Sequence, residues 1–232
     1  MEKRINLLLY FFIFVVLISL LGFFNTYLKF FPDLNKFPII IHIHFLAFVA
    51  WFSLLIIQPI LIKRNKINLH RKIGKLSYFL AIVLVITILI LAYNQISREI
   101  VLPQNSAAIT AFIALIDIVS FSLFYIIAMT KSKNLRWHIA FLMAATLVVL
   151  NPGLSRLLNQ IQHGLGMITA VFLPFAISIS LVIFEKIKYK RPIFKSPYFL
   201  YLCIWSIIIV LFATVPKTEV WINFIQDTFI SS

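Results

Sequence analysis

The five histidines of this chain are the residues whose type and spacing first suggest chemistry. His42, His44 and His163 lie near one end of the apolar segments described below, and His70 and His138 lie near the other end. Two layers of imidazoles on different helices are typical of a protein that holds one haem near each membrane face, with each iron between two histidines. The pattern therefore predicts haem b as a candidate cofactor, and electron transfer as the leading function.

His44 is the better of the two neighbouring histidines as a ligand, because residues two apart on a helix point about 200° apart. His44, Trp51 and Gln58 recur at seven-residue spacing and should form one inward-facing stripe. Arg156 and His163 are also seven apart, and they would share a face if that connection is helical. We therefore expect His44 and His163 as the outer ligands, with Arg156 placed to meet a haem propionate.

His70 and His138 are the predicted ligands on the other side. His70 should point inward, because it shares a helix face with the small residues Gly74 and Ala81. The alternative for both histidines is a role as anchors at the headgroup boundary, where histidine, tryptophan and arginine are common. Small residues on the His70 face are equally compatible with close helix packing.

Asp117 is a carboxylate in the middle of an apolar segment, with Thr110 and Ser120 on roughly the same helix face. An acid at that depth has to be protonated, paired or exposed to a wet cavity, since burying an isolated charge is costly. One interpretation is the proton or cation site of a small proton-coupled carrier. The other is a protonated side chain that bonds to a neighbouring helix and stabilises packing.

The composition requires a membrane around these residues. Hydrophobic residues make up 62% of the chain and charged residues 12%, whereas a soluble domain has about half and a quarter. The net charge of +14 does not indicate a nucleic-acid partner, because the basic residues lie in short clusters between apolar runs. The lipid bilayer is therefore the predicted partner, with other membrane subunits as an open option.

Seven apolar segments have the length of about 20 residues that a helix needs to cross a bilayer. We predict an all-α bundle of about seven transmembrane helices that forms a single domain over residues 1–232. An outer interfacial tail, either a short helix or disordered, is expected at 216–232. The predicted helices are approximately 5–24, 38–62, 76–94, 107–130, 137–155, 164–184 and 197–215.

The basic residues predict the orientation of the bundle. When the loops are assigned to alternate sides, 16 of the 21 lysines and arginines fall on the side of the N-terminus and 5 on the other. Short cytoplasmic loops carry this excess in membrane proteins. We therefore expect the N-terminus inside and the C-terminus outside, with the loops 63–75, 131–136 and 186–195 in the cytoplasm.

Two short motifs carry a resemblance: His44-x6-Trp51-x6-Gln58-x2-Leu61-Ile62 with His70-Arg71-x2-Gly74, and His138-x3-Leu142-Met143-x2-Ala145-Thr146 with Arg156 beyond it. Over residues 38–165 the chain resembles a family of uncharacterised bacterial polytopic inner-membrane proteins with a His-Arg-x-x-Gly loop motif. That family often has a basic residue shortly after its second histidine, where Ile139, Ala140 and Phe141 stand here. The resemblance implies a multi-helix fold in a bacterial inner membrane and supplies no activity.

Several enzyme classes are excluded by missing motifs. The sequence has no P-loop, no GxSxG and no CxxC, and five histidines are too few for a membrane di-iron desaturase. Whether the chain is an enzyme stays open at this point. Besides haem-based electron transfer and proton-coupled transport, a third interpretation is a membrane assembly or scaffold protein without chemistry of its own.

Overall fold

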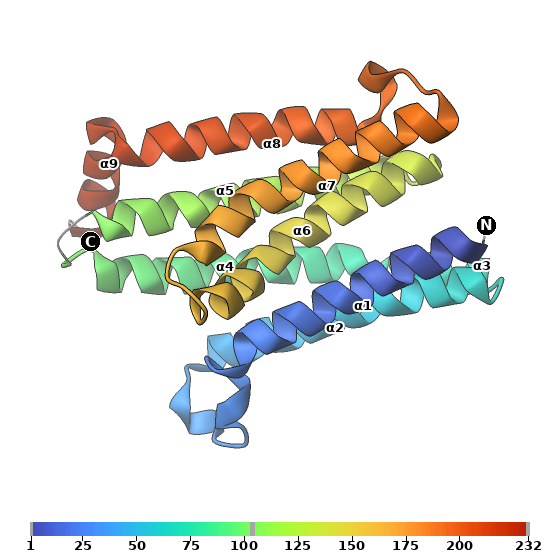
Figure 1. Cartoon of the computed structure of the whole chain (residues 1–232). Coiled ribbons are helices and arrows are strands. Elements are labelled where there is room, and N and C mark those ends of the chain that lie inside the picture. Colours follow the sequence, from blue (N-terminus) through green and yellow to red (C-terminus); the bar gives the residue numbers. More distant parts are fainter. Residues whose placement is uncertain (1, 103–104, 231–232) are drawn as a thin grey trace. The chain divides into compact units, whose positions relative to one another are not determined.

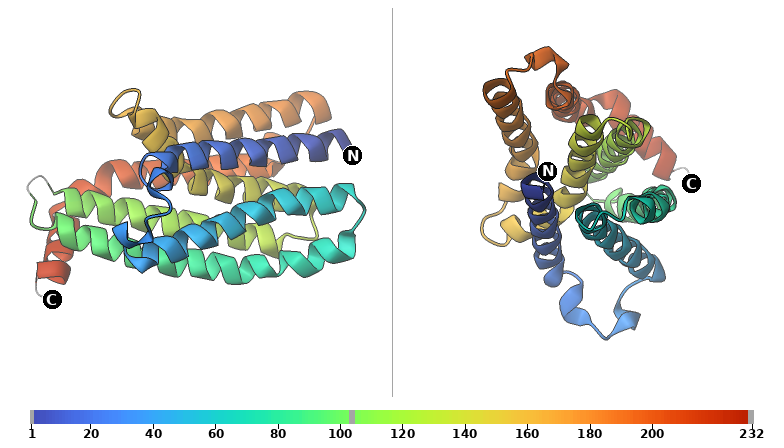
Figure 2. Two further views of the ribbon diagram at one scale, coloured as in Figure 1. Left: turned by 90° about the horizontal axis from the view of Figure 1, so that it is seen from below. Right: turned by 90° about the vertical axis from the view of Figure 1, so that its right-hand side faces the viewer.

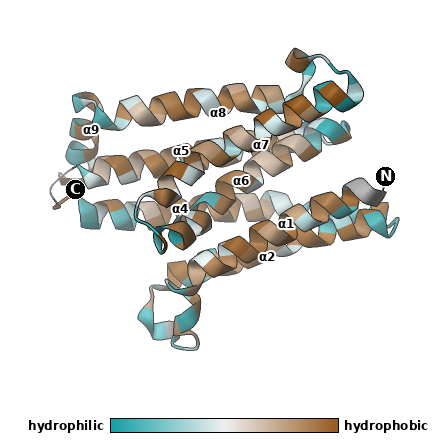
Figure 3. Ribbon diagram, in the orientation of Figure 1, coloured by the Kyte–Doolittle hydropathy of each residue, from teal (hydrophilic) through white to brown (hydrophobic). Residues whose placement is uncertain are grey.

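The computed structural model describes residues 2–102 and 105–230, in which nearly every residue is helical and no strand occurs. Within these ranges, seven helices are long and apolar enough to cross a membrane. Hydropathic colouring follows the same pattern, with hydrophobic residues along the helices and hydrophilic ones at many helix ends and connections (Figure 3). The prediction of an all-α bundle of about seven transmembrane helices is therefore confirmed, and the chain is a multi-pass membrane protein.

The helices agree with the predicted segments, and several extend further at their ends. The α-helices are α1 (Glu2–Phe24), α2 (Ile39–Lys63), α3 (Ile67–Gly74), α4 (Leu76–Glu99), α5 (Ser106–Thr130), α6 (Leu135–Asn159), α7 (Leu165–Tyr189), α8 (Pro197–Thr214) and α9 (Glu219–Ile230). Four short 3-10 turns, η1 to η4, are Leu28–Phe30, Leu34–Lys36, Ile193–Lys195 and Val215–Lys217. The short helix α3 is an addition to the predicted ranges, in which the next helix begins at residue 76.

The chain divides into two compact units, Met1–Leu91 and Ala92–Ser232, with the boundary inside α4. In unit 1, α1 and α2 run side by side, joined by the 3-10 turns η1 and η2 (Figure 1). The rings of Phe23 on α1 and Phe48 on α2 meet edge to face, with centroids 6.0 Å apart. After α2 the chain reverses through Asn65, whose φ of 57° is a left-handed conformation that asparagine tolerates.

In unit 2, α5, α6, α7 and α8 form the main helical group (Figure 2). Small residues allow close approach: a Cβ added to Gly166 at the start of α7 would lie only 2.6 Å from the backbone of Ser155 on α6. Between α7 and α8, the Trp205 indole N–H donates to the Val171 carbonyl oxygen at 3.0 Å. These contacts hold the transmembrane helices of unit 2 together.

The predicted tail is a helix, α9, which is one of the two alternatives that the sequence left open. It turns away from the direction of α8 (Figure 1). The Trp221 indole N–H donates to the Ala108 carbonyl oxygen at 2.9 Å, and Ile225 is buried beside Ile96 and Ala107. Because it is tied to α4 and α5 in this way, α9 is an integral part of unit 2.

Candidate functional site

His44 is held by a hydrogen bond that determines its tautomer. Its Nδ1 lies 2.7 Å from the Thr87 hydroxyl oxygen on α4. That hydroxyl donates its single proton to the backbone, 2.7 Å from the Val83 carbonyl oxygen and 3.1 Å from that of Leu84. Thr87 therefore accepts from His44, so the proton of the neutral imidazole is on Nδ1 and the lone pair is on Nε2. A metal-binding histidine is usually oriented through its other nitrogen in this way.

The stripe of His44, Trp51 and Gln58 faces into unit 1, as predicted. Trp51 is buried, and Gln58 reaches across to α3. The orientation of the Gln58 amide, assigned from its neighbours, places its oxygen 3.1 Å from the Gly74 backbone nitrogen. Its nitrogen then donates to the His70 carbonyl oxygen at 3.2 Å and to His70 Nδ1. Gln58 thus joins α2 to both ends of the His-Arg-x-x-Gly motif.

His70 consequently has the opposite tautomer to His44. Its Nδ1 accepts a hydrogen bond from Gln58, so the proton of the neutral ring is on Nε2. The inward direction predicted for His70 is correct, since the ring faces α2. Its Nε2 carries a proton in this arrangement, which does not suit the nitrogen that would bind iron.

His42, two residues before His44, bonds elsewhere. Its Nδ1 lies 2.6 Å from the Tyr27 hydroxyl in the connection between α1 and α2. Burial raises the pKa of Tyr27 above its ordinary value, so the phenol stays protonated at neutral pH. The two neighbouring histidines of α2 therefore have different partners, as expected from their opposite directions on the helix.

The histidines of unit 2 lie at opposite ends of α6. His138 Nδ1 lies 2.8 Å from the Ala128 carbonyl oxygen, and because a carbonyl only accepts, the proton is on Nδ1. His163 is exposed in the turn after α6, which ends at Asn159. The condition for Arg156 and His163 to share a helix face is therefore not met. The Arg156 guanidinium donates back to the Pro152 carbonyl oxygen at 3.0 Å.

Neither His44 with His70 nor His138 with His163 can bracket a single iron. His70 lies on α3 and contacts Gln58, which is about 21 Å along α2 from His44. His138 and His163 are separated by most of α6, since His138 lies about 32 Å along the helix from its last residue, Asn159. Two axial nitrogens of one haem lie about 4 Å apart, so neither pair brackets one iron.

Asp117 lies on the inner face of α5. It shares that face with the buried residues Ser120 and Phe121 and lies opposite the exposed Val119. Among the described residues, no hydrogen bond or ion pair to its carboxylate is present. The predicted neighbour Thr110 bonds instead to Glu99, with 2.5 Å between the hydroxyl and a carboxylate oxygen.

Sequence reasoning missed an ionic cluster around Glu185 near the end of α7. Arg136 of α6 donates through Nε at 2.6 Å and also through Nη2, and Arg191 donates at 3.2 Å. The Ser196 hydroxyl donates to the same carboxylate at 2.7 Å. The signal in the sequence was a single acid within a strongly basic region, where Arg136 and Arg191 counted only toward topology.

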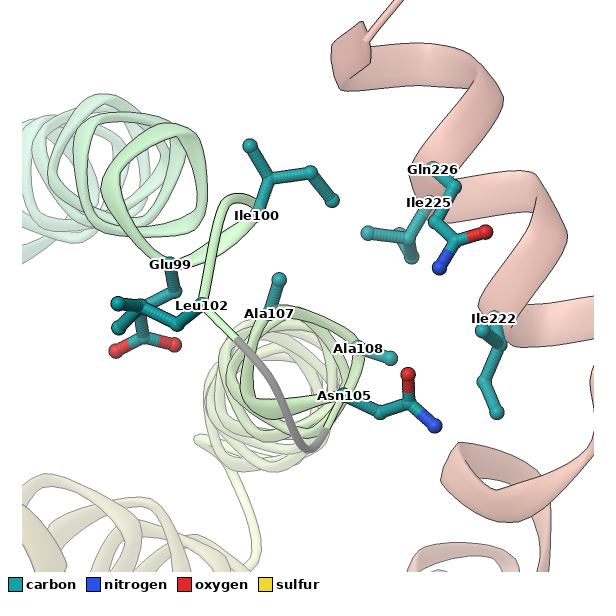
Figure 4. Close-up of a pocket in the computed structure, with 9 residues that line it drawn as sticks. All are labelled: Glu99, Ile100, Leu102, Asn105, Ala107, Ala108, Ile222, Ile225 and Gln226. Carbon is teal, nitrogen blue, oxygen red and sulfur yellow. The ribbon is translucent and has the colours of Figure 1, made fainter.

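A small pocket opens where α9 covers the α4–α5 connection (Figure 4). Its interior of about 30 Å³ has room for about one water molecule. Glu99, Asn105 and Gln226 provide its polar groups, and no histidine lines it. The pocket is therefore too small for an organic cofactor.

Comparison with known protein families, with curated proteins and with solved structures finds no match to this chain. Within residues 2–102 and 105–230, no group of three or more His, Cys, Asp or Glu side chains is arranged to hold a metal ion.

Proposed function

We propose that this protein is a haem-binding electron-transfer protein of a bacterial inner membrane, with one haem near the outer face and His44 as an axial ligand. The observation that carries the proposal is the hydrogen bond from His44 Nδ1–H to Thr87. With Thr87 as the acceptor, the lone pair is on Nε2 and the ring is oriented through Nδ1, as is usual for a metal-binding imidazole.

Residues around His44 supply further support. The Phe48 ring lies 5.8 Å from the His44 ring and packs edge to face on Phe52 at 4.5 Å. Aromatic side chains of this kind exclude water, as the wall of a haem site must. A bound haem would supply one-electron redox chemistry. His163 as the second ligand and Arg156 as the propionate partner stay predictions from the sequence.

The proposal is for one haem and not two. An inner haem would need His70 and His138, and only His138 carries its lone pair on Nε2. His70 is engaged through Nδ1 by Gln58 and is better explained as part of the joint between α2 and α3. The proposed protein therefore holds no haem between His70 and His138.

The absorption spectrum of the purified protein tests this proposal. The protein expressed with haem supplementation should show a Soret band that shifts on reduction with dithionite. His44→Ala should lose the band, whereas His42→Ala, which removes an imidazole two residues away, should keep it. A purified, folded protein without a Soret band, or a band that survives in His44→Ala, would refute the assignment.

Asp117 supports a second candidate function, proton-coupled transport. Its carboxylate is on the inner face of α5 without a hydrogen bond among the described residues, and the nearby Ser120 hydroxyl is buried without one. A carboxylate used only for packing would be expected to bond to a neighbouring helix. If transport is the function, Asp117→Asn should abolish pH-driven uptake in proteoliposomes while the amount of folded protein stays unchanged. Unaltered uptake would remove this candidate.

A further inference from the structure

The connection from α2 to α4 carries an unusual concentration of positive charge. Six of the thirteen residues 63–75 are lysine or arginine and none is acidic. All six side chains are exposed: Lys63, Arg64, Lys66, Arg71, Lys72 and Lys75. The positive-inside rule accounts for an excess of cations in this loop. It does not account for the way in which the cations of α3 are arranged on one face of the helix.

Helix α3 divides its surface into three stripes. His70 and Gly74 face α2 through Gln58. Leu69, Ile73 and the following Leu76 form an apolar stripe, in which Leu69 is 39% and Leu76 57% exposed. Asn68, Arg71, Lys72 and Lys75 recur at the i, i+3, i+4 and i+7 positions of one face. We call Arg71, Lys72 and Lys75 the cationic stripe.

The length of α4 places α3 at the level of the lipid headgroups. With 24 residues, α4 is about 36 Å long, which already exceeds the hydrocarbon core of about 30 Å. Only Lys75 separates it from α3, so α3 must lie at or beyond the end of the core. An apolar stripe beside a cationic stripe is the pattern of a helix in the membrane interface.

The Gln58 amide keeps this helix in place. Its bonds to the His70 carbonyl oxygen and the Gly74 nitrogen fix the rotation of α3 relative to α2. Lys72 and its neighbours in the cationic stripe are therefore presented in one direction. No carboxylate from residues 63–75 competes for them, so phosphate groups of the membrane are the anions best placed to neutralise the stripe.

We propose that the cationic stripe of α3 binds the headgroup phosphates of anionic phospholipids, of which phosphatidylglycerol is the representative. The apolar stripe contacts the upper part of the acyl chains, and the cations contact the phosphates. This site is independent of any haem. Electrostatic attraction to an anionic lipid surface is worth about a fivefold change in binding for each cation.

Native mass spectrometry of the full chain tests the proposal. The protein is released from detergent that contains equal amounts of phosphatidylglycerol and phosphatidylcholine, and retained lipids are counted. Wild type should prefer phosphatidylglycerol, and Arg71→Gln with Lys72→Gln should lower that preference at least fivefold. The matched control, Lys133→Gln with Lys186→Gln, removes two exposed cations of unit 2 and should leave it unchanged. Arg71→Gln alone serves if the double variant does not fold.

Three results would overturn the proposal. The first is a wild type without preference for the anionic lipid, and the second is an equal loss in the variant and its control, which would reflect net charge alone. The third is displacement of the lipid by excess inorganic phosphate, which would indicate a site for the free anion. Retention in the presence of phosphate supports the lipid as the ligand.

Discussion

Each unit has an end that is predicted to face the cytoplasm, and the helices within the unit are connected there by different chemistry. In unit 1 the neutral amide of Gln58 connects α2 to the backbone and ring of His70. In unit 2 the Glu185 carboxylate connects α7 to Arg136 and Arg191. We call the Gln58 contact the neutral joint and the Glu185 contact the ionic joint. The neutral joint leaves the surrounding cations available to the membrane, whereas the ionic joint neutralises the cations beside it. The same excess of basic residues therefore serves a surface in one unit and internal cohesion in the other.

Breaking the ionic joint should have the largest effect. Glu185→Gln removes the carboxylate that is the counter-ion of Arg136. The Glu185 side chain is only 7% exposed and the Arg136 side chain 25%. Removing one partner of a buried pair is strongly destabilising, so we expect a loss of about 3 kcal/mol in the free energy of unfolding. Unfolding of detergent-solubilised protein measures it. Glu219→Gln, an exposed acid on α9, is the control, and an equal effect there would contradict this role of Glu185.

The contribution of Arg191 to the same joint should be much smaller, because its side chain is 43% exposed. Exposed ion pairs contribute about 0–1 kcal/mol. We expect Arg191→Gln to stay within that range in the same unfolding measurement. A loss as large as that of Glu185→Gln would mean that Arg191, and not Arg136, is the main partner of the carboxylate.

Two glycines sharpen the comparison between the units. A Cβ on Gly166 would lie 2.6 Å from the Ser155 backbone in unit 2, whereas a Cβ on Gly74 would lie 3.7 Å from the nearest Gln58 atom, an ordinary contact. Gly166→Ala should therefore lower stability by about 2 kcal/mol through overpacking. Gly74→Ala should be tolerated, and equal thermal midpoints for the two variants would contradict this difference.

Removing the neutral joint should cost less than removing the ionic one. Gln58→Leu deletes three hydrogen bonds, two to His70 and one to Gly74, and at this half-buried position each contributes about 0.5 kcal/mol, the low end for neutral hydrogen bonds. We expect a loss of about 1–2 kcal/mol and faster amide hydrogen exchange in α3. Unchanged exchange in residues 67–74 would show that Gln58 does not hold the helix.

Single cysteine substitutions, which should perturb the protein least, test whether the loops 63–75 and 131–136 lie on the same side of the membrane. Ser132→Cys and Asn68→Cys introduce thiols at exposed positions of the loops 131–136 and 63–75, which are predicted to be cytoplasmic. An impermeant maleimide added to intact cells should label neither, but should label Gln162→Cys in the opposite loop. Efficient labelling of Ser132→Cys from outside would reverse the predicted orientation.

The sequence was sufficient for features that depend on local pattern. The apolar runs predicted the membrane spans, and seven-residue spacing predicted that Trp51 and Gln58 face inward. It was insufficient where contacts join distant segments: Arg136 and Glu185 are 49 positions apart, and neither has a local signal for the other. The tautomers of His44 and His70 also depend on such contacts, since Thr87 lies 43 residues from His44.

The haem content of the purified protein tests the proposed function most directly. The pyridine haemochrome assay on wild type should give about one haem per chain, in keeping with one histidine whose tautomer suits an outer iron. His70→Ala should retain that haem and His44→Ala should lose it. A chain that binds no haem, or a haem that depends on His70 and not on His44, would contradict the proposal.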